Sequence, residues 1–419
     1  RLIFVSFAQE VYASMDPLDV LMNKSKVLPY YQPIVSADNQ MVVAYDVLAR
    51  YEGSEGEESL GWFFHDTSIP DEYRLELEDH VQTLALEHYL AGDDQLILCL
   101  KYNGVLLAKT NGENVLKRLE FYQEQGLDLT KVIIGIKEEQ LDGHLDDLKH
   151  VFMYFQSLGI RMSIDDVGLS EANLDRLALL KPNIVKVNLE RFHEEAFSQM
   201  YQEVHHSLSM LTRKIGATLL FEGISQFNQL NYAWRNGGRY YQGLYLAPPR
   251  ETFVDRELCK EKLQKDFHHF IVYERKKMEA QLQLTEKANQ QLRITLKRIE
   301  HMTSYDEMVL AIAQDCDEFA FRVYITDGDG FQQSSNAEKD ENGEWKLRGE
   351  GRYKNWSWRP YFLENIVRMN YEKRGILSDL YTDIQRDERI RTYAYPIKDN
   401  LYVYLDIPYQ YLFEQDGLI

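Results

Sequence analysis

The sequence has little cysteine, no long apolar run and no excess of positive charge. Its three cysteines, Cys99, Cys259 and Cys316, are scattered and odd in number, so neither a disulfide framework nor a CxxC metal site is indicated. Isolated thiols are typical of a reducing compartment, and we expect a cytoplasmic protein. No apolar stretch reaches the ~18 residues that span a bilayer, and we expect no membrane partner.

Acidic residues outnumber basic residues in this chain. The chain has 47 Lys and Arg against 67 Asp and Glu, a net charge of −20, which argues against general binding to nucleic acid or to anionic membranes. An anionic ligand would need a local basic pocket. The 419 residues, 44% of them hydrophobic, are enough for a large core and indicate two domains.

The chain divides into four parts by composition. The opening RLIFVSFAQEVYAS precedes Met15 and has no cleavage-like site, so we expect residues 1–14 to be a tag or non-native extension. We expect a first domain over residues 15–250, a helical linker over 251–303 and a second domain over 304–419.

Short apolar runs alternate with helical patterns through most of the first domain. Residues 31–35 and 41–47 flank a polar turn at 36–40, which predicts an antiparallel strand pair. Strand and helix patterns then alternate about eight times through Pro248. This predicts an α/β fold, a TIM-like (β/α)8 barrel with an antiparallel first strand, in which chemistry belongs at the carboxyl ends of the strands.

Charged residues stand at those strand ends: Asp46, Lys101, Lys137, Asp165, Asp166, Lys186 and Glu222. Paired carboxylates such as Asp165 and Asp166 suit hard cations like Mg²⁺, because those ions prefer oxygen ligands. The other interpretation of this pair is a helix N-cap or a turn before Gly168. Seven charges at equivalent positions favour a functional site.

Several motifs resemble those of EAL domains, the family that hydrolyses cyclic di-GMP. In family order, they are YQPI at 31–34, DVLAR at 46–50, SIDDVGLS at 163–170, NIVKVNL at 183–189, LLFEGIS at 219–225 and QGLYLAPP at 242–249. The resemblance covers about Val20 to Pro249. It implies a barrel whose hydrolytic members use metal-activated water.

The resemblance also implies roles for individual residues. Lys186 and Glu222 match catalytic positions, and the metal-ligand positions fall on Asp46, Asp165, Asp166 and Glu222, for Mg or Mn. The ligand-binding positions fall on Gln32, Leu48, Arg50, Asp166 and Gln242.

Departures from the family pattern weaken the implied metal site. Asp46 is one methylene shorter than the family's Glu, Lys101 replaces an Asn ligand and Gly135 replaces a Glu ligand. Lys101 and Lys137 are expected to balance the carboxylates in place of a dication. We therefore expect the metal site to be weak or lost, no cofactor to be bound, and Lys186 and Glu222 to be insufficient for catalysis.

The linker has no Gly or Pro, and this composition predicts one long helix over residues 251–302. Its apolar positions are Leu263, Phe267, Phe270, Leu292, Leu296 and Ile299. They fit an imperfect two-helix coil in a homodimer, or packing of the helix against its own chain.

The second domain mixes strand and helix patterns with many aromatic residues, and a polar loop is expected at 336–343. Residues 355–365 and 376–397 resemble the α+β PAS- or Cache-like sensor domain of EAL proteins of the YkuI type from bacilli. That resemblance implies a pocket for a small carboxylate, formed by Trp358, Arg359, Tyr361, Tyr381 and Asp406. The other interpretation is an aromatic core capped by an arginine.

These observations predict a cytoplasmic cyclic di-GMP signalling protein with a catalytically degenerate EAL domain that acts by ligand binding or protein interaction. One alternative is a metal-dependent cyclic di-GMP phosphodiesterase of low activity. The other is a scaffold that binds no nucleotide and whose C-terminal domain senses a small molecule.

Overall fold

The computed structural model describes residues 15–53, 56–92, 96–167, 174–190, 199–359, 362–383, 386–398 and 400–414. Residues 1–14 and Tyr361, which carry predictions above, lie outside this part. The chain divides into two compact units, one ending at Phe267 and the other beginning at His268.

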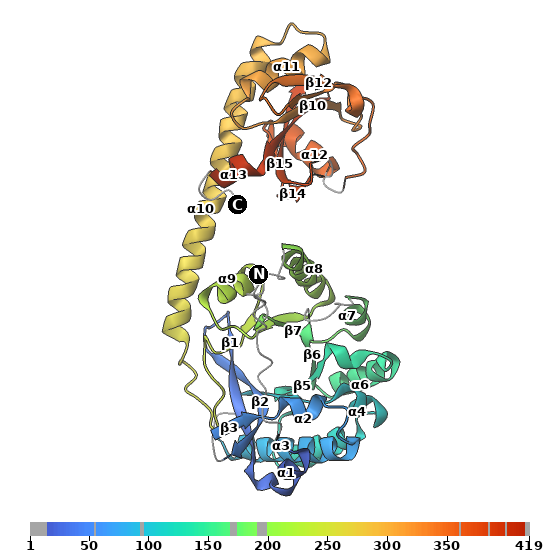
Figure 1. Cartoon of the computed structure of the whole chain (residues 1–419), viewed down its shortest axis with the longest axis vertical. Helices are drawn as coiled ribbons and strands as arrows, with labels where there is room; N and C mark the ends of the chain where they lie inside the picture. Colours follow the sequence, from blue (N-terminus) through green and yellow to red (C-terminus); the bar gives the residue numbers. More distant parts are fainter. Residues whose placement is uncertain are drawn as a thin grey trace, which may run out of the picture. The chain divides into compact units, whose positions relative to one another are not determined.

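The first unit contains a closed, mainly parallel barrel (Figure 1). The ring order is β1-β9-β8-β7-β6-β5-β4-β2, and the pairing of β1 with β2 closes it. β1 is antiparallel to both of its neighbours. The predicted barrel with an antiparallel first strand is therefore confirmed. The ring strands are β1 (Val27–Ser36), β2 (Val42–Gly53), β4 (Ile97–Lys101), β5 (Val132–Lys137), β6 (Arg161–Val167), β7 (Ile184–Asn188), β8 (Thr218–Glu222) and β9 (Tyr240–Tyr241).

Amphipathic helices connect the strands and lie outside the ring (Figure 1). In α6, Leu148, Val151, Phe152 and Phe155 are buried at steps of three and four residues, which places one apolar face against the strands. The helices of this unit are α1 (Pro17–Met22), α2 (Gly61–His65), α3 (Asp71–Ala91), α4 (Gly104–Lys109), α5 (Glu113–Gln123), α6 (Leu145–Ser157), α7 (Leu174–Leu180), α8 (Gln199–Ile215) and α9 (Phe227–Arg235).

Strand register brings the charged strand ends to one rim. Lys101 of β4 stands beside Gly135 of β5, and Lys137 of β5 stands beside Asp165 of β6. Gln32 of β1 stands opposite Asp46 of β2. Residues that are far apart in sequence therefore meet at the mouth of the barrel.

The Gly- and Glu-rich segment after Arg50 is partly strand. β2 continues to Gly53 and pairs with β3 (Gly56–Ser59) in a hairpin. Such a composition is typical of loops, but pairing with the end of β2 satisfies backbone hydrogen bonds of β3.

The linker forms one helix, α10 (Lys260–Arg298), shorter at its start than the predicted helix. Residues before it pack on the barrel instead, since the Phe253 ring lies 4.6 Å from Tyr31 and 4.7 Å from Tyr45 between centroids. The apolar residues proposed for an intersubunit coil are covered within their own chain; Leu263, Phe270 and Leu292 are all buried.

The second unit contains, among its described residues, a seven-stranded sheet in the order β12-β11-β10-β16-β15-β13, with β14 beside β15. Of the polar loop predicted at 336–343, residues 336–339 form β11, which pairs with β12 in a hairpin, and residues 340–343 form the turn between the two strands, so the prediction was wrong for its first half. The strands are β10 (Arg322–Asp327), β11 (Asn336–Lys339), β12 (Trp345–Arg348), β13 (Ile376–Leu377), β14 (Tyr381–Thr382), β15 (Arg389–Lys398) and β16 (Leu401–Pro408), and the helices are α11 (Tyr305–Asp315), α12 (Phe362–Glu372) and α13 (Tyr409–Glu414).

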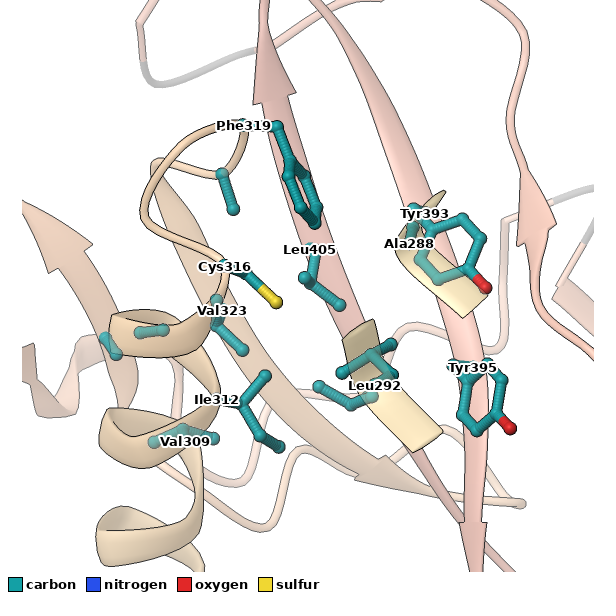
Figure 2. Packing of buried hydrophobic residues seen from close by; sticks show 14 of the residues in the cluster. Ala288, Leu292, Val309, Ile312, Cys316, Phe319, Val323, Tyr393, Tyr395 and Leu405 are labelled. Carbon is teal, nitrogen blue, oxygen red and sulfur yellow. The ribbon is translucent and has the colours of Figure 1, made fainter. Parts of the chain in front are cut away.

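The C-terminal part of α10 belongs to the core of this second unit. Leu292 lies among Ile312 of α11, Val323 of β10 and Leu405 of β16 in one buried apolar cluster (Figure 2). Packing against its own chain is therefore the correct interpretation for this part of the helix.

Candidate functional site

A buried lysine lies at the centre of the barrel mouth. Lys186 of β7 is fully buried, and its Nζ lies 2.7 Å from Asp46 Oδ1 and 3.1 Å from Asp165 Oδ2. Burial alone would lower the pKa of Lys186, but Asp165 and Asp46 hold it well above its usual value. Lys186 is therefore a fixed positive charge shared by one carboxylate of β2 and one of β6.

Asp46 has further partners. Lys101 Nζ lies 3.1 Å from Asp46 Oδ2, and Gln242 Nε2 donates to the same oxygen at 3.1 Å. Burial would raise the pKa of Asp46, but Lys101 and Lys186 lower it to about 2. Both carboxylate oxygens of Asp46 are thus engaged by side chains of this chain.

The neighbouring carboxylate Asp166 forms a second ion pair. Lys137 Nζ lies 2.8 Å from Asp166 Oδ2, and Asn188 Nδ2 donates to Asp166 Oδ1 at 2.9 Å. The backbone of Asp166 is in the left-handed region, with φ of 59°, and its N–H donates to Glu222 Oε1 at 3.3 Å. Burial raises the pKa of Glu222 to about 8, although Lys101 and Lys186 oppose this shift.

Gly135 leaves space that Asp165 uses. A Cβ at this position would lie 2.7 Å from Asp165 Oδ2 and 3.0 Å from Ser163 Oγ, closer than ordinary contacts. Ser163 Oγ donates to Asp165 Oδ1 at 2.7 Å. Asp165 therefore points toward Lys186 and Ser163, and a larger residue at position 135 would displace it.

This donor set does not fit a divalent cation. Within the described ranges, no three histidine, cysteine, aspartate or glutamate side chains converge as metal ligands. Asp46, Asp165 and Asp166 each pair with a lysine ammonium, which repels a cation. The four predicted metal-ligand residues come together at the mouth, where Asp46, Asp165 and Asp166 pair with lysines and Glu222 accepts from the backbone N–H of Asp166.

A cavity of about 190 Å³ opens beside these residues. Leu48, Lys101, Gly135, Lys137 and Asp165 line it, together with side chains of α2 and α3. It is large enough for part of a ligand, and it places two lysines beside the carboxylates.

The predicted ligand-binding residues Gln32 and Arg50 lie on β1 and β2 near the mouth, and Gln242 directly follows β9. Gln242 Nε2 donates to Gln32 Oε1 at 2.9 Å, so these two side chains are joined. Arg50 follows Asp46 on the same face of β2. Its Nε is buried and, among the described residues, has no hydrogen-bond partner.

The predicted sensor residues are only partly together. Arg359 and Tyr381 line a small cavity of about 30 Å³ in the second unit, with Trp356 and Thr392 among its other walls. Trp358 is 68% exposed, and Asp406, which is not among the lining residues, pairs with Arg322 and accepts from the hydroxyl of Thr392. Tyr361 lies outside the described residues.

Family models match both units. Residues 17–249 match the EAL domain, and residues 253–419 match the EAL-domain associated signalling protein domain. The chain belongs to the EAL-domain family.

Two known proteins are similar in sequence to this EAL protein. The uncharacterized EAL-domain containing protein YkuI of Bacillus subtilis strain 168 is 42% identical over 407 residues, which are 97% of this chain and 100% of that protein. The "probable cyclic di-GMP phosphodiesterase PdeD" of Escherichia coli K12 is 22% identical over 228 residues, 52% of this chain and 41% of its own length.

The crystal structure of Bacillus subtilis YkuI in complex with the substrate c-di-GMP and calcium has a TM-score of 0.91 to this EAL protein. The similarity covers 97% of this chain and 100% of that one, at 42% identity. The described part of the EAL protein contains no helix long and apolar enough to cross a bilayer.

Sequence reasoning missed two polar residues in the cavity of the EAL domain. Glu78 and Gln82 of α3 are buried, and both line the cavity. Glu78 accepts from the backbone N–H of Asn103 at 2.9 Å, whereas Gln82 Oε1 has no partner among the described residues. Two polar residues four apart on an otherwise apolar helix face were the available signal.

Glu78 predicts a pH dependence of stability. Burial raises its pKa to about 8, whereas an unfolded Glu titrates near about 4.3. The folded state therefore binds a proton that the unfolded state releases, and stability falls as pH rises from about 5 to about 8. The free energy of unfolding therefore has a negative slope against pH in this range. Glu78→Gln should reduce the steepness of that slope by up to about 1.4 kcal/mol per pH unit, as measured by urea unfolding at several pH values.

The matched control is Glu72→Gln, an exposed position on the same helix, which should leave the slope unchanged. Glu222 contributes a slope of the same sign, so the Glu78→Gln protein should keep part of the dependence. An unchanged slope in Glu78→Gln would show that Glu78 is charged when folded.

Proposed function

We propose that this EAL protein is a cyclic di-GMP receptor whose barrel binds the nucleotide and does not hydrolyse it at a useful rate. The observation that carries the proposal is that Asp46, Asp165 and Asp166 at the barrel mouth are each paired with a lysine of the same chain. The complex of the Bacillus subtilis relative with c-di-GMP supports binding by this fold.

The loss of hydrolysis follows from chemistry. A bound metal ion lowers the pKa of water from ~15.7 toward ~7 and so supplies hydroxide at neutral pH. Lys186 forms ion pairs with Asp46 and Asp165, which raise its pKa and keep it protonated. A protonated lysine does not serve as a general base. Water near the mouth therefore keeps its ordinary, low reactivity.

Phosphate binding needs positive charge and hydrogen-bond donors and not a metal-bound hydroxide, and side chains at the mouth provide both. Arg50 offers a buried N–H without a partner among the described residues, and a guanidinium suits bidentate contacts with phosphate. Gln32, Leu48, Asp166 and Gln242 complete the predicted ligand-binding set. A cyclic dinucleotide would place its negative charge on Arg50 and on the lysines of the cavity.

The alternative of a low-activity phosphodiesterase requires Mg or Mn at Asp46, Asp165, Asp166 and Glu222. The cation would have to displace Lys101 from Asp46 and Lys137 from Asp166. Both displacements would leave ammonium groups near the cation, which disfavours this alternative.

Arg50→Ala tests the receptor function. Hydrogen bonds to charged groups contribute about 1.5–3 kcal/mol, so the variant should bind cyclic di-GMP about 10- to 100-fold more weakly in calorimetric titration. The control Arg239→Ala removes an exposed arginine paired with Asp38 and should bind as the wild type does.

The same samples should be analysed for linear product with Mn²⁺ present. The receptor function predicts product at the level of buffer alone. Product that is formed by the wild type and lost in Asp165→Ala would contradict it.

The small cavity of the second unit favours a second candidate function, the sensing of a small molecule. Its lining includes the cation of Arg359 and the hydroxyls of Ser378, Tyr381 and Thr392. The Arg359 guanidinium lies 4.6 Å from the centroid of the Trp356 ring, which orients it by a cation–π contact. A carboxylate of the size of acetate suits this volume and charge.

Arg359→Gln tests the sensor function. Acetate at millimolar concentration should raise the Tm of the wild type, because ligand binding stabilises the folded state, and should leave Arg359→Gln unchanged. The control Arg368→Gln, an exposed arginine of α12, should respond as the wild type does. Equal responses of all three proteins to acetate and to chloride would contradict a carboxylate site.

We also propose a homodimer, with α10 as its contact. Ile271, Met278 and Leu282 are exposed on this helix at steps of seven and four residues, the spacing of a coiled-coil seam. Leu282→Glu should shift the molar mass in light scattering toward the monomer, whereas Phe121→Glu, at an exposed position on α5, should not. A wild-type mass of one chain would contradict the dimer.

The cytoplasm is the proposed location. Cys99, Cys259 and Cys316 are all free thiols, which suits a reducing compartment.

A further inference from the structure

Two lysines at the mouth keep donors available to a ligand. The side chains of Lys101 and Lys137 are 37% and 31% exposed, and both line the cavity. Each ammonium has three N–H donors. Lys101 pairs with Asp46 and Lys137 with Asp166, so neither lysine uses all of its donors on these carboxylates.

Gly135 keeps the space between these lysines open. It stands beside Lys101 in the register of β4 and β5, and it precedes Lys137 by two residues on the same face of β5. A side chain here would meet Asp165 and would also fill part of the cavity that Gly135 lines. Because Gly135 and both lysines line the same cavity, an anionic group that enters it is attracted by both ammonium charges.

We propose that Lys101 and Lys137 form a phosphodiester-binding site that takes the place of a divalent cation, so that nucleotide binding by this barrel is independent of metal. The inference rests on the proposed receptor function and names the groups that hold the phosphate. Each lysine is oriented by its carboxylate partner and donates to a phosphate oxygen from the other side.

The charges at the mouth favour this arrangement over a bound dication. Lys101, Lys137 and Lys186 neutralise Asp46, Asp165 and Asp166 through contacts of 2.7 to 3.1 Å. A dication at the same carboxylates would either meet these ammonium groups or release them, and release would break buried ion pairs. A phosphate adds negative charge next to the exposed side of the lysines, where it is attracted.

A purely structural role of the lysines makes a different prediction. If they served only to neutralise carboxylates, removing one would lower stability without changing the affinity of the folded protein for nucleotide. Affinity measured on folded variants therefore separates the two roles.

The test is calorimetric titration of cyclic di-GMP into the full chain, in EDTA and separately in Ca²⁺. The wild type should bind with affinities within about 3-fold of each other in the two buffers. Lys101→Gln and Lys137→Gln should each lose at least about 10-fold in EDTA, the size of one charged hydrogen bond. Circular dichroism confirms that each variant is folded.

Two control variants test whether the effect depends on the positive charge and on its position. Lys101→Arg keeps the positive charge and should retain more affinity than Lys101→Gln. Lys117→Gln removes an exposed lysine that pairs with Glu113 on α5 and should bind as the wild type does. Wild-type affinity in both glutamine variants would overturn the phosphate site.

The metal dependence separates this inference from the proposed function. Binding that is lost in EDTA and restored by Ca²⁺ would overturn the inference and leave the receptor function standing. Tight binding of Mn²⁺ to the nucleotide-free wild type, measured by electron paramagnetic resonance, would also overturn it. No binding of nucleotide in any buffer would contradict both.

Discussion

The buried ion pairs of Lys186 with Asp46 and Asp165 are the interaction on which the barrel mouth depends. A fully buried lysine would be expensive to keep charged without partners, and two carboxylates from β2 and β6 supply them. The pair with Asp46 joins strands on opposite sides of the ring, and the pair with Asp165 joins the neighbouring strands β7 and β6. They also decide the chemistry, because the carboxylates that satisfy Lys186 are those that the family resemblance assigns to a metal.

Further ion pairs surround the buried pairs at the rim of the barrel, and they involve Lys101 and Lys137, with Gly135 between them in sequence. Lys101 engages the second oxygen of Asp46, and Lys137 engages Asp166. The absence of a side chain at Gly135 lets Asp165 turn toward Lys186 and Ser163. These substitutions therefore act together: the positive charge at the mouth comes from side chains of the chain itself, and it remains accessible from the adjoining cavity.

Much of this could be predicted from the sequence, for identifiable reasons. Strand ends carry their residues to one rim of a barrel by topology, so Asp46, Lys101, Asp165 and Lys186 could be grouped before their distances were known. Glu78 and Gln82 could not, because a helix pattern does not show which polar residue faces a cavity. The burial of Leu292 within its own chain depended on tertiary packing, which heptad spacing does not distinguish from a coil between two chains. The hairpin of β11 and β12 was missed because its polar residues are typical of loops, and only pairing with β10 makes it a strand.

A crystal structure of this EAL protein with cyclic di-GMP, grown in calcium and recorded with anomalous scattering, tests the central claim most directly. We expect a phosphate oxygen within hydrogen-bonding distance of Lys101 or Lys137, with both lysines still beside their carboxylates and no anomalous peak at the mouth. A calcium ion bound by Asp46, Asp165 and Glu222, with Lys101 displaced, would contradict it.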